Sequence, residues 1–207
     1  MYEIFICQAN DFVGTVYLDC MRNDKIREVI QKLEEYDKAT YLHSVRVAKY
    51  AVLLASVTDY EDLKEVAIAG LLHDVGKVYL SKDLINKTDK LTPIEYEAIK
   101  NHVRWSTMIA HDAKVDKSVA LGVFEHHERL NGQGYPLGTI GNQLSQIGKI
   151  IAVADVFDAL TSNRPYREKL DLSAVKQIMA NEESLDPQLV EIILRVNELD
   201  IRAVHVW

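Results

Sequence analysis

The chain has 207 residues, of which 48% are hydrophobic and 27% are charged, and its formal net charge is -7. This length allows one well-formed core with a small appendage, and the charged fraction excludes a protein built mainly of membrane spans. The negative charge argues against sequence-independent binding of nucleic-acid polymers, which requires a basic face. A small anionic ligand is still compatible with it, because metal ions and a few cationic side chains can supply local positive charge.

The first residues and the cysteines predict a cytoplasmic protein. The segment MYEIFICQAN has no basic stretch followed by a long apolar one, so we expect no secretory signal. No apolar run approaches the ~20 residues that cross a bilayer. Cys7 and Cys20 form no metal-binding spacing and no framework of pairs, which is typical of a reducing compartment. The sequence leaves open whether the chain forms a homodimer.

The pattern of side chains divides the chain into two parts. Residues 1–22 are rich in strand-forming side chains, broken near Asn10-Asp11 and at Gly14, and predict a short β-rich segment. Residues 23–207 predict one helical domain, because apolar residues recur there at helical spacing. The alternation of residues 201–207 predicts a last strand that pairs with the N-terminal ones. The expected fold class is therefore all-α with a small β appendage.

Local signals place the ends of several helices. Thr92-Pro93-Ile94-Glu95 has Thr at the N-cap, Pro at N1 and Glu at N3, which is a capping box that starts a helix. Asp186-Pro187 starts the last helix in the same way, and the glycine-rich stretch 131–138 cannot be helical. The predicted helices cover residues 23–33, 40–57, 62–75, 92–111, 116–129 and 145–160, with two more after Asp171 and Asp186.

An ordered set of imidazole and carboxylate side chains lies on these predicted helices. Its members are His43, His73-Asp74, His102, His126-His127 and Asp155. Such groups are costly to bury unless something pairs with them, and a cluster of divalent metal ions pairs with several at once. Asp155 lies one and two turns beyond Ile151 and Ile147 on an apolar stripe, so its carboxylate must be paired, coordinated or protonated.

Each part of this set has an ordinary structural explanation when it is taken alone. Asp155 could bond to a neighbouring backbone or arginine group, and His126-His127 could interact with the dipole of a helix end. His73-Asp74 is a weak signal by itself, although a carboxylate between two metal ions can bridge them. The whole set in this order is improbable by chance, so the sequence predicts a metal site.

The sequence resembles the HD-GYP subgroup of the HD superfamily, the metal-dependent phosphodiesterases of cyclic di-GMP. The resemblance covers roughly residues 36–190 and is carried by DKATYLHSVRVAKYA, LLHDVGKV, LTPIEYEAIKNH, EHHERLNGQGYPLG, ADVFDALTSNRPYR and SLDPQLV. It implies an HD-type helical bundle with a di-iron or di-manganese centre, in which Asp74 bridges the metals. The implied ligands are His43, His73, Asp74, His102, His126, His127 and Asp155.

The resemblance also bears on the number of metals and on the substrate. Some members hold a third metal through a Glu one turn before the first histidine, and Ala39 occupies that position here, so two metals are expected. Asp74 and Lys77 correspond to catalytic positions. The positions that correspond to substrate contacts are Lys77, Arg164 and Arg167, with Asp37 and Asp158 as further polar contacts.

The chemistry of phosphodiester cleavage suits these residue types. The reaction needs a nucleophile at neutral pH and neutralisation of the charge that grows on the phosphoryl oxygens, and two metals about 3.5–4 Å apart meet both needs. Lys77 would add a point charge against a nonbridging oxygen. Arg164 and Arg167 could make forked contacts to the second phosphate or to guanine edges. For Arg167, an ion pair at the surface is the alternative.

Three further residues lie in or near the segments that carry the resemblance. Tyr135 is expected to stack on a base, to engage a signalling partner through the Gly132–Pro136 loop, or to anchor that loop by packing; the sequence does not separate these. Asn131 replaces the family's usual Asp. Val103, Arg104 and Trp105 follow His102 where the family commonly has Pro and then Gly, and Trp105 is expected to narrow or reshape the pocket. Neither departure removes a predicted ligand.

The leading expectation is an enzyme of bacterial signalling that hydrolyses cyclic di-GMP to pGpG, and the sequence leaves open whether cleavage continues to GMP. Three alternatives remain: a phosphodiesterase of another cyclic dinucleotide such as cyclic GMP-AMP, a nucleotide phosphohydrolase with the same metal core, and a catalytically silent module that binds a dinucleotide or a partner. The complete ligand set argues against the silent module. The metal is not identified, because affinity alone does not select iron or manganese over zinc.

Overall fold

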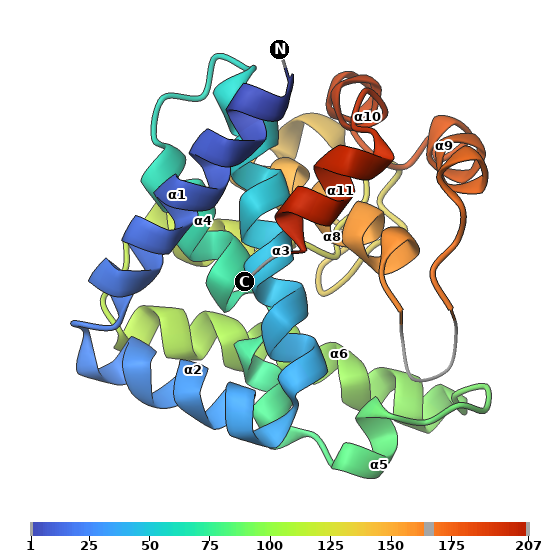
Figure 1. The fold of residues 1–207 in the computed structure, drawn as a ribbon. Coiled ribbons are helices and arrows are strands. Elements are labelled where there is room, and N and C mark those ends of the chain that lie inside the picture. The colour runs from blue at the N-terminus through green and yellow to red at the C-terminus, as the bar shows by residue number, and fades with distance from the viewer. Residues whose placement is uncertain (1, 164–167, 206–207) are drawn as a thin grey trace.

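The computed structural model describes residues 2–163 and 168–205 of the chain (Figure 1). Within these ranges the chain is all-α, and the one β-type pairing is an isolated bridge between Asn131 and Ile140. The α-helices are α1 (Tyr2–Cys20), α2 (Asp24–Tyr36), α3 (Lys38–Ser56), α4 (Leu63–Leu72), α5 (Lys82–Ile85), α6 (Pro93–Asp112), α7 (Lys117–Glu125), α8 (Gln146–Thr161), α9 (Leu172–Ala180), α10 (Pro187–Ile193) and α11 (Glu198–Val204). Two short 3₁₀-helices are η1 (Val75–Tyr79) and η2 (Gly141–Gln143).

The predicted β appendage is wrong at both ends of the chain. Residues 2–20 form α1, whose buried face consists of Ala9, Val13, Val16 and Cys20, spaced by four, three and four residues as a helix requires. This face packs against α3 and α4, so tertiary packing overrides the strand propensity of the segment. Residues 198–204 form α11 rather than a strand, and residues 206–207 lie outside the described part. The boundary after residue 22 stays a prediction.

The predicted helix starts are confirmed where a polar side chain caps the helix. The Thr92 side chain and the Glu95 side chain make both bonds of the capping box that starts α6. Asp186 accepts from the backbone at the start of α10, and Asp171 does the same for α9. These boundaries were predictable because the capping residues lie within three positions of the amides that they satisfy.

Two helix ends differ from the prediction, and both bear on the candidate site. Helix α4 ends at Leu72 and α7 ends at Glu125, so His73-Asp74 and His126-His127 lie in turns just beyond the helices. Consecutive residues inside a helix point about 100° apart. Leaving the helix removes this restriction, so both side chains of a pair can face one centre.

Helix α3 forms the middle of the bundle, with α1 and α4 on one side and α8 on the other (Figure 1). The crossing of α3 and α4 is close, because a Cβ built on Gly70 would lie only 2.6 Å from the Cα of Ala48. Only glycine allows the two backbones to approach this far. The crossing brings the segment that follows α4 beside the first half of α3, where His43 lies.

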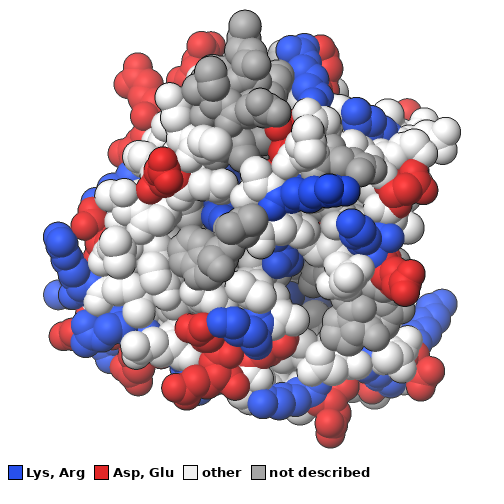
Figure 2. Space-filling model, in the orientation of Figure 1, with Lys and Arg blue, Asp and Glu red and all other residues white. Residues whose placement is uncertain are grey.

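Basic and acidic side chains are mixed on one face of the molecule. On the face drawn in Figure 2, the described basic and acidic side chains are interspersed rather than gathered in one broad basic band. This agrees with the net charge of -7. No helix within the described ranges combines the length and the apolar character that a bilayer crossing requires.

Candidate metal centre

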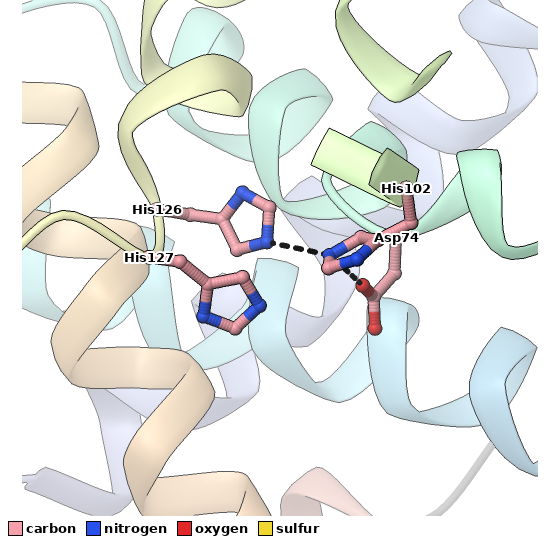
Figure 3. A group of neighbouring side chains, drawn as sticks. All are labelled: Asp74, His102, His126 and His127. Carbon is pink, nitrogen blue, oxygen red and sulfur yellow. Dashed lines mark hydrogen bonds and ion pairs between the residues drawn. The ribbon is translucent and has the colours of Figure 1, made fainter. Parts of the chain in front are cut away.

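All seven predicted ligands meet in one cluster at the middle of the bundle. Their possible ligand atoms form two groups, within each of which the atoms lie no more than 4.8 Å apart. The first group is Asp74, His102, His126 and His127, whose side chains point toward one another in Figure 3, and the second is His43, His73 and Asp155. Segments far apart in the sequence therefore supply one buried site.

Asp74 is placed between the two groups. Its Oδ1 lies 3.2 Å from Nε2 of His102 in the first group. Its Oδ2 lies 3.4 Å from Nε2 of His73 and 3.7 Å from Nε2 of His43, both in the second group. One carboxylate thus presents one oxygen to each group, which is the geometry that a bridging ligand needs.

Three of the histidines have their ring orientation fixed by the backbone. Nδ1 of His73, His102 and His126 each lies 2.6–2.8 Å from the carbonyl oxygen three residues earlier, to which it donates. This bond assigns the proton to Nδ1, so Nε2 carries a lone pair that faces the cluster. Each ring can reach the carbonyl oxygen three residues earlier because the histidine lies in a helix or at the end of one.

His43 is oriented by a carboxylate instead. Its Nδ1 lies 2.6 Å from Oδ2 of Asp158, and its Nε2 lies 3.0 Å from Oδ1 of Asp155 in the cluster. Arg46 makes a forked contact to Asp158, with Nε 2.6 Å from Oδ1 and Nη2 3.0 Å from Oδ2. Such carboxylate–histidine pairs hold metal ligands in the correct tautomer and orientation.

The role predicted for Asp158 needs correction. Its side chain is 0% exposed, and its oxygens are taken by His43, Arg46 and the Ser162 hydroxyl. Asp158 therefore lies behind a candidate ligand rather than at the surface of the pocket, and we assign it to positioning His43 instead of contacting substrate.

The donor atoms of the cluster fit a cation. Nε2 of His102 and Nε2 of His126 face each other at 3.4 Å, and each already has its proton on the opposite ring nitrogen. Nε2 of His73 and Oδ1 of Asp74 are buried and have no hydrogen-bond partner among the described residues. Buried acceptors that face one another are costly, and divalent cations satisfy such groups, so the two groups are consistent with a binuclear metal site.

The charge states also suit metal binding. Burial lowers the pKa of His126 and His127 well below the usual value, and neighbouring histidines lower it further, so both rings are neutral. Burial would raise the pKa of Asp74, but Lys77 and His73 outweigh it and hold this pKa well below its usual range. Neutral imidazoles and ionised carboxylates are the forms in which these side chains bind metal.

The pKa values of Asp155 and His73 are also shifted by neighbouring charges in the cluster. Burial would also raise the pKa of Asp155, but the bond from His43 and the nearby histidines hold it well below its usual value. For His73, burial lowers the pKa, but the attraction of Asp74 and Asp155 is larger and raises it. The two carboxylates that favour a proton on His73 would favour a cation in the cluster for the same electrostatic reason.

A pocket of about 270 Å³ opens against the cluster. Its described lining includes the predicted residues Asp37, Lys77 and Tyr135, and also Ala39, which offers no carboxylate for a third metal. Nζ of Lys77 donates to Oδ2 of Asp74 at 2.6 Å. Polar groups and a cation therefore line the pocket beside the carboxylate that lies between the two ligand groups.

Three residues named from the sequence are not among the described lining of this pocket. Arg164 and Arg167 fall outside the described residues, so their predicted substrate contacts stay predictions. Trp105 is not among the described lining of the pocket, and its ring packs against Tyr79 with 5.7 Å between centroids. The expected effect of Trp105 on the pocket therefore stays a prediction, because the described contact of this ring is with Tyr79 of η1.

Two buried glutamates that flank His126-His127 were not predicted. Glu125 accepts from the backbone N–H and the hydroxyl of Ser145, at 2.8 and 2.5 Å, and so fixes the start of α8, which carries Asp155. Glu128 accepts from three amides of the glycine-rich loop, those of Leu137, Gly138 and Thr139, at 2.7, 3.2 and 3.0 Å. The available sequence signal was a carboxylate near each side of a histidine pair.

Comparison with known proteins identifies the family. A model of the HD domain family matches residues 27–189. The cyclic di-GMP phosphodiesterase PA4108 of Pseudomonas aeruginosa is 32% identical over 185 residues, which cover 87% of this chain and 45% of that protein. Bd1817, an HDG"Y"P protein from Bdellovibrio bacteriovorus, shares the fold, with a TM-score of 0.65 at 22% identity over 94% of this chain and 62% of Bd1817. The chain belongs to the HD domain family, in its HD-GYP type.

The HD-GYP relatives differ in the substrate that they are named for. The 3'3'-cGAMP-specific phosphodiesterase 1 of Vibrio cholerae is 37% identical over 161 residues, which cover 75% of this chain and 37% of that protein. The HD-GYP chain described here thus spans less than half the length of these two curated relatives. The family match begins in α2 and ends in α10, so α1 and α11 lie outside it.

Proposed function

We propose that this HD-GYP chain is a metal-dependent phosphodiesterase that hydrolyses a cyclic dinucleotide. The observation that carries the proposal is the position of Asp74, which presents one oxygen to each ligand group and accepts from Lys77 on the wall of an open pocket. Curated relatives are named for cyclic di-GMP and for 3'3'-cGAMP. Cyclic di-GMP is the first substrate of the proposal, and 3'3'-cGAMP is the second.

The seven side chains would hold two divalent cations, one in each group, with Asp74 shared between them. When bound, the cations supply Lewis-acid stabilisation of the phosphoryl oxygens and lower the pKa of water at neutral pH. Iron and manganese are the metals that the family resemblance implies. Burial of the cluster strengthens every charge interaction within it, because the effective dielectric constant is lower than in water.

Lys77 supplies the charge that the protein itself brings to the reaction. Its ammonium group lines the pocket and its side chain is partly exposed, so it can reach a phosphate while it still contacts Asp74. As negative charge grows on a nonbridging oxygen, the ammonium group donates to that oxygen without having to move into place. This preorganised contact is stronger in the transition state than in the bound substrate, which is what accelerates the reaction.

The pocket offers different surfaces to different parts of a nucleotide. Four apolar side chains form one wall of the pocket. They are Leu80 just after η1, Ile85 of α5, Leu91 in the loop that follows α5, and Ile99 of α6. Polar side chains on the remaining lining are Asp37, Thr40, Asn86 and Asn163. In this proposal the apolar wall takes the face of a base, and the polar groups contact ribose and phosphate.

The size of the pocket limits how much of the substrate it encloses. Its volume of about 270 Å³ lies just below the range of small-molecule sites, which run from about 300 to 1,000 Å³. One nucleotide half of a cyclic dinucleotide is enclosed, and the other half lies at the mouth. We propose Arg164 and Arg167 for contacts to this outer half, as the family resemblance implies.

Anaerobic purification, metal quantification and incubation with each cyclic dinucleotide test the proposal. With added ferrous or manganous ion, we expect two metals per chain and conversion of cyclic di-GMP to pGpG or GMP. Asp74→Asn keeps the shape of the side chain and should lose both metal and activity. The matched control is Asp83→Asn in the exposed part of α5, which should behave as the parent protein.

The outcomes separate the parts of the proposal. Two metals with turnover of 3'3'-cGAMP alone would change the substrate and keep the phosphodiesterase. Two metals with no product from either dinucleotide would remove the proposed activity and favour a silent binding module. A parent protein that takes up no metal would remove the metal centre itself.

A further inference from the structure

His127 is held differently from the other four histidines of the cluster. Each of the other four has its Nδ1 bonded to a carbonyl or to Asp158. Within the described residues no hydrogen bond reaches Nδ1 of His127, since Oδ2 of Asp155 lies 3.9 Å away. The side chain of His127 is also 20% exposed. Its ring therefore needs another constraint to keep one orientation.

An aromatic ring supplies that constraint. The ring of Tyr135 lies on the ring of His127 with centroids 4.6 Å apart and an interplanar angle of 29°. Tyr96 of α6 contacts Tyr135 edge to face at 6.3 Å and 78°. Both distances fall within the range of favourable aromatic pairs, about 4.5–7 Å. The three rings form a column that runs from α6 to the metal cluster.

Lys100 closes the outer end of this column. Its ammonium group lies 4.6 Å from the centroid of Tyr96 and 5.5 Å from the centroid of Tyr135. Both values are within the ~6 Å over which a cation is attracted to the face of a ring. One cation thus ties together the two tyrosines that back His127.

The glycine-rich loop is fastened so that Tyr135 cannot leave His127 easily. The amide of Tyr135 donates to the carbonyl oxygen of His127 at 3.1 Å. A Cβ on Gly134 would lie 2.4–2.5 Å from backbone atoms of residues 127–129, so only glycine permits this approach. On the other side of Tyr135, the Glu128 carboxylate holds the amides of residues 137–139.

We propose that Tyr135, backed by Tyr96 and Lys100, is the group that positions the metal ligand His127. This inference rests on the metal centre of the proposed function. It assigns the loop 131–138 a part in metal binding, where the sequence left base stacking, partner docking and loop anchoring open. One face of Tyr135 is covered by His127, so that face is not available to a nucleobase.

Metal affinity tests the role of the stack directly. We would titrate the apo protein with Mn²⁺ against a chelating dye and obtain a separate dissociation constant for each metal. Tyr135→Leu removes the ring and should weaken one of the two metals about tenfold or more, as loss of a group behind a ligand does. Tyr135→Phe keeps the ring and should bind both metals as the parent does.

Two further variants sharpen the comparison. Lys100→Met keeps the apolar stem and removes the charge, so it should weaken the same metal by a smaller factor, about threefold. Tyr79→Leu removes an exposed aromatic ring that pairs with Trp105 away from the cluster, and it should change neither affinity. Thermal unfolding of the apo variants shows whether each one folds.

Four results would overturn the inference. Parent-like affinities in Tyr135→Leu would show that His127 needs no stack. Equal losses in Tyr135→Phe and Tyr135→Leu would assign the effect to the hydroxyl group instead of the ring. Equal weakening of both metals, with a lower unfolding temperature, would mean a general structural role. A parent protein without metal would remove the proposed centre and this inference together.

Discussion

Asp158 lies 2.6 Å from Nδ1 of His43 and fixes which ring nitrogen of His43 faces the cluster. Arg46 in turn holds both oxygens of Asp158, so the carboxylate is buried without being left unpaired. Asp158 comes from the last turns of α8 and His43 from the first half of α3. The contact therefore ties a candidate ligand to the helix that also carries Asp155.

Asp158→Asn should weaken metal binding about 10–100-fold, the usual cost of changing a group behind a ligand. The amide keeps the size of the side chain but loses the charge that holds His43 and Arg46. Competitive metal titration measures the effect. Asp171→Asn is the control, because asparagine caps a helix as well as aspartate does. Equal metal affinity in parent and Asp158→Asn would contradict this role.

The contacts of Asp158 with His43 and Arg46 also predict how the stability of the metal-free protein depends on pH. Burial would raise the pKa of Asp158, but His43 and Arg46 outweigh it and hold this pKa below its usual value. The pKa is depressed in the folded state, so the stabilisation is present above the unfolded value of about 3.9 and is lost as pH falls below it. Urea unfolding from pH 6 to pH 3 should show the parent losing its advantage over Asp158→Asn below about pH 4. An advantage that stays constant down to pH 3 would argue against this linkage.

Lys77→Met should affect both the pH range of metal binding and the rate. Lys77 helps to hold the pKa of Asp74 down, so its removal raises that pKa and metal is released at a higher pH than in the parent. The loss of one donor to the transition state should also lower kcat about a hundredfold. Lys82→Met on the neighbouring helix α5 is the control. An unshifted metal-binding profile from pH 4 to pH 7 would be inconsistent with the contact.

Glu128→Gln should loosen the glycine-rich loop. The carboxylate accepts from three amides, and hydrogen bonds to charged groups contribute about 1.5–3 kcal/mol each, whereas a neutral amide oxygen contributes less. We expect a lower urea midpoint and faster proteolysis within residues 131–138. The control is the exposed Glu183→Gln. Proteolysis at the parent's rate would show that the loop is held by other contacts.

Thiol reactivity tests whether α1 packs against the core. Cys20 is buried on the inner face of α1, and burial raises the pKa of its thiol to about 11, whereas Cys7 is exposed. The reactive species is the thiolate, so at pH 8 a thiol reagent should label one cysteine in the folded protein and both after unfolding. Cys7→Ser should abolish labelling of the folded protein. Rapid labelling of Cys20 would show that α1 does not hold this position.

Sequence predicted the features that depend on neighbouring residues, and those that depend on distant ones were missed. The capping box at Thr92 and the N-cap at Asp186 are local, and both are confirmed. The forked contact between Arg46 and Asp158 joins residues 112 positions apart, and no local sequence pattern predicts it. Arg46 follows His43 by three positions, which puts both on one face of α3, and this spacing was the available hint.

The strand predictions for the two end segments were wrong for a related reason. Strand propensity measures how well side chains fit a half-buried surface, so it depends on what the segment packs against. Val13 and Val16 of α1 are buried against other helices, and no partner strand is present within the described residues. The helical spacing of the buried residues was the correct signal, and the β-branched composition was the misleading one.

The contact between Gly70 and Ala48 has a consequence for how the site could change. The gap between α3 and α4 at this point admits no methyl group, because a Cβ on Gly70 would meet backbone atoms. His43 precedes Ala48 by five residues on α3, and His73 follows Gly70 by three residues, just beyond the end of α4. The close approach of the two main chains therefore limits the width of the second ligand group. A homologue that kept all seven ligands but carried alanine at position 70 would therefore have to splay the two helices, and would present the same donors over a wider span.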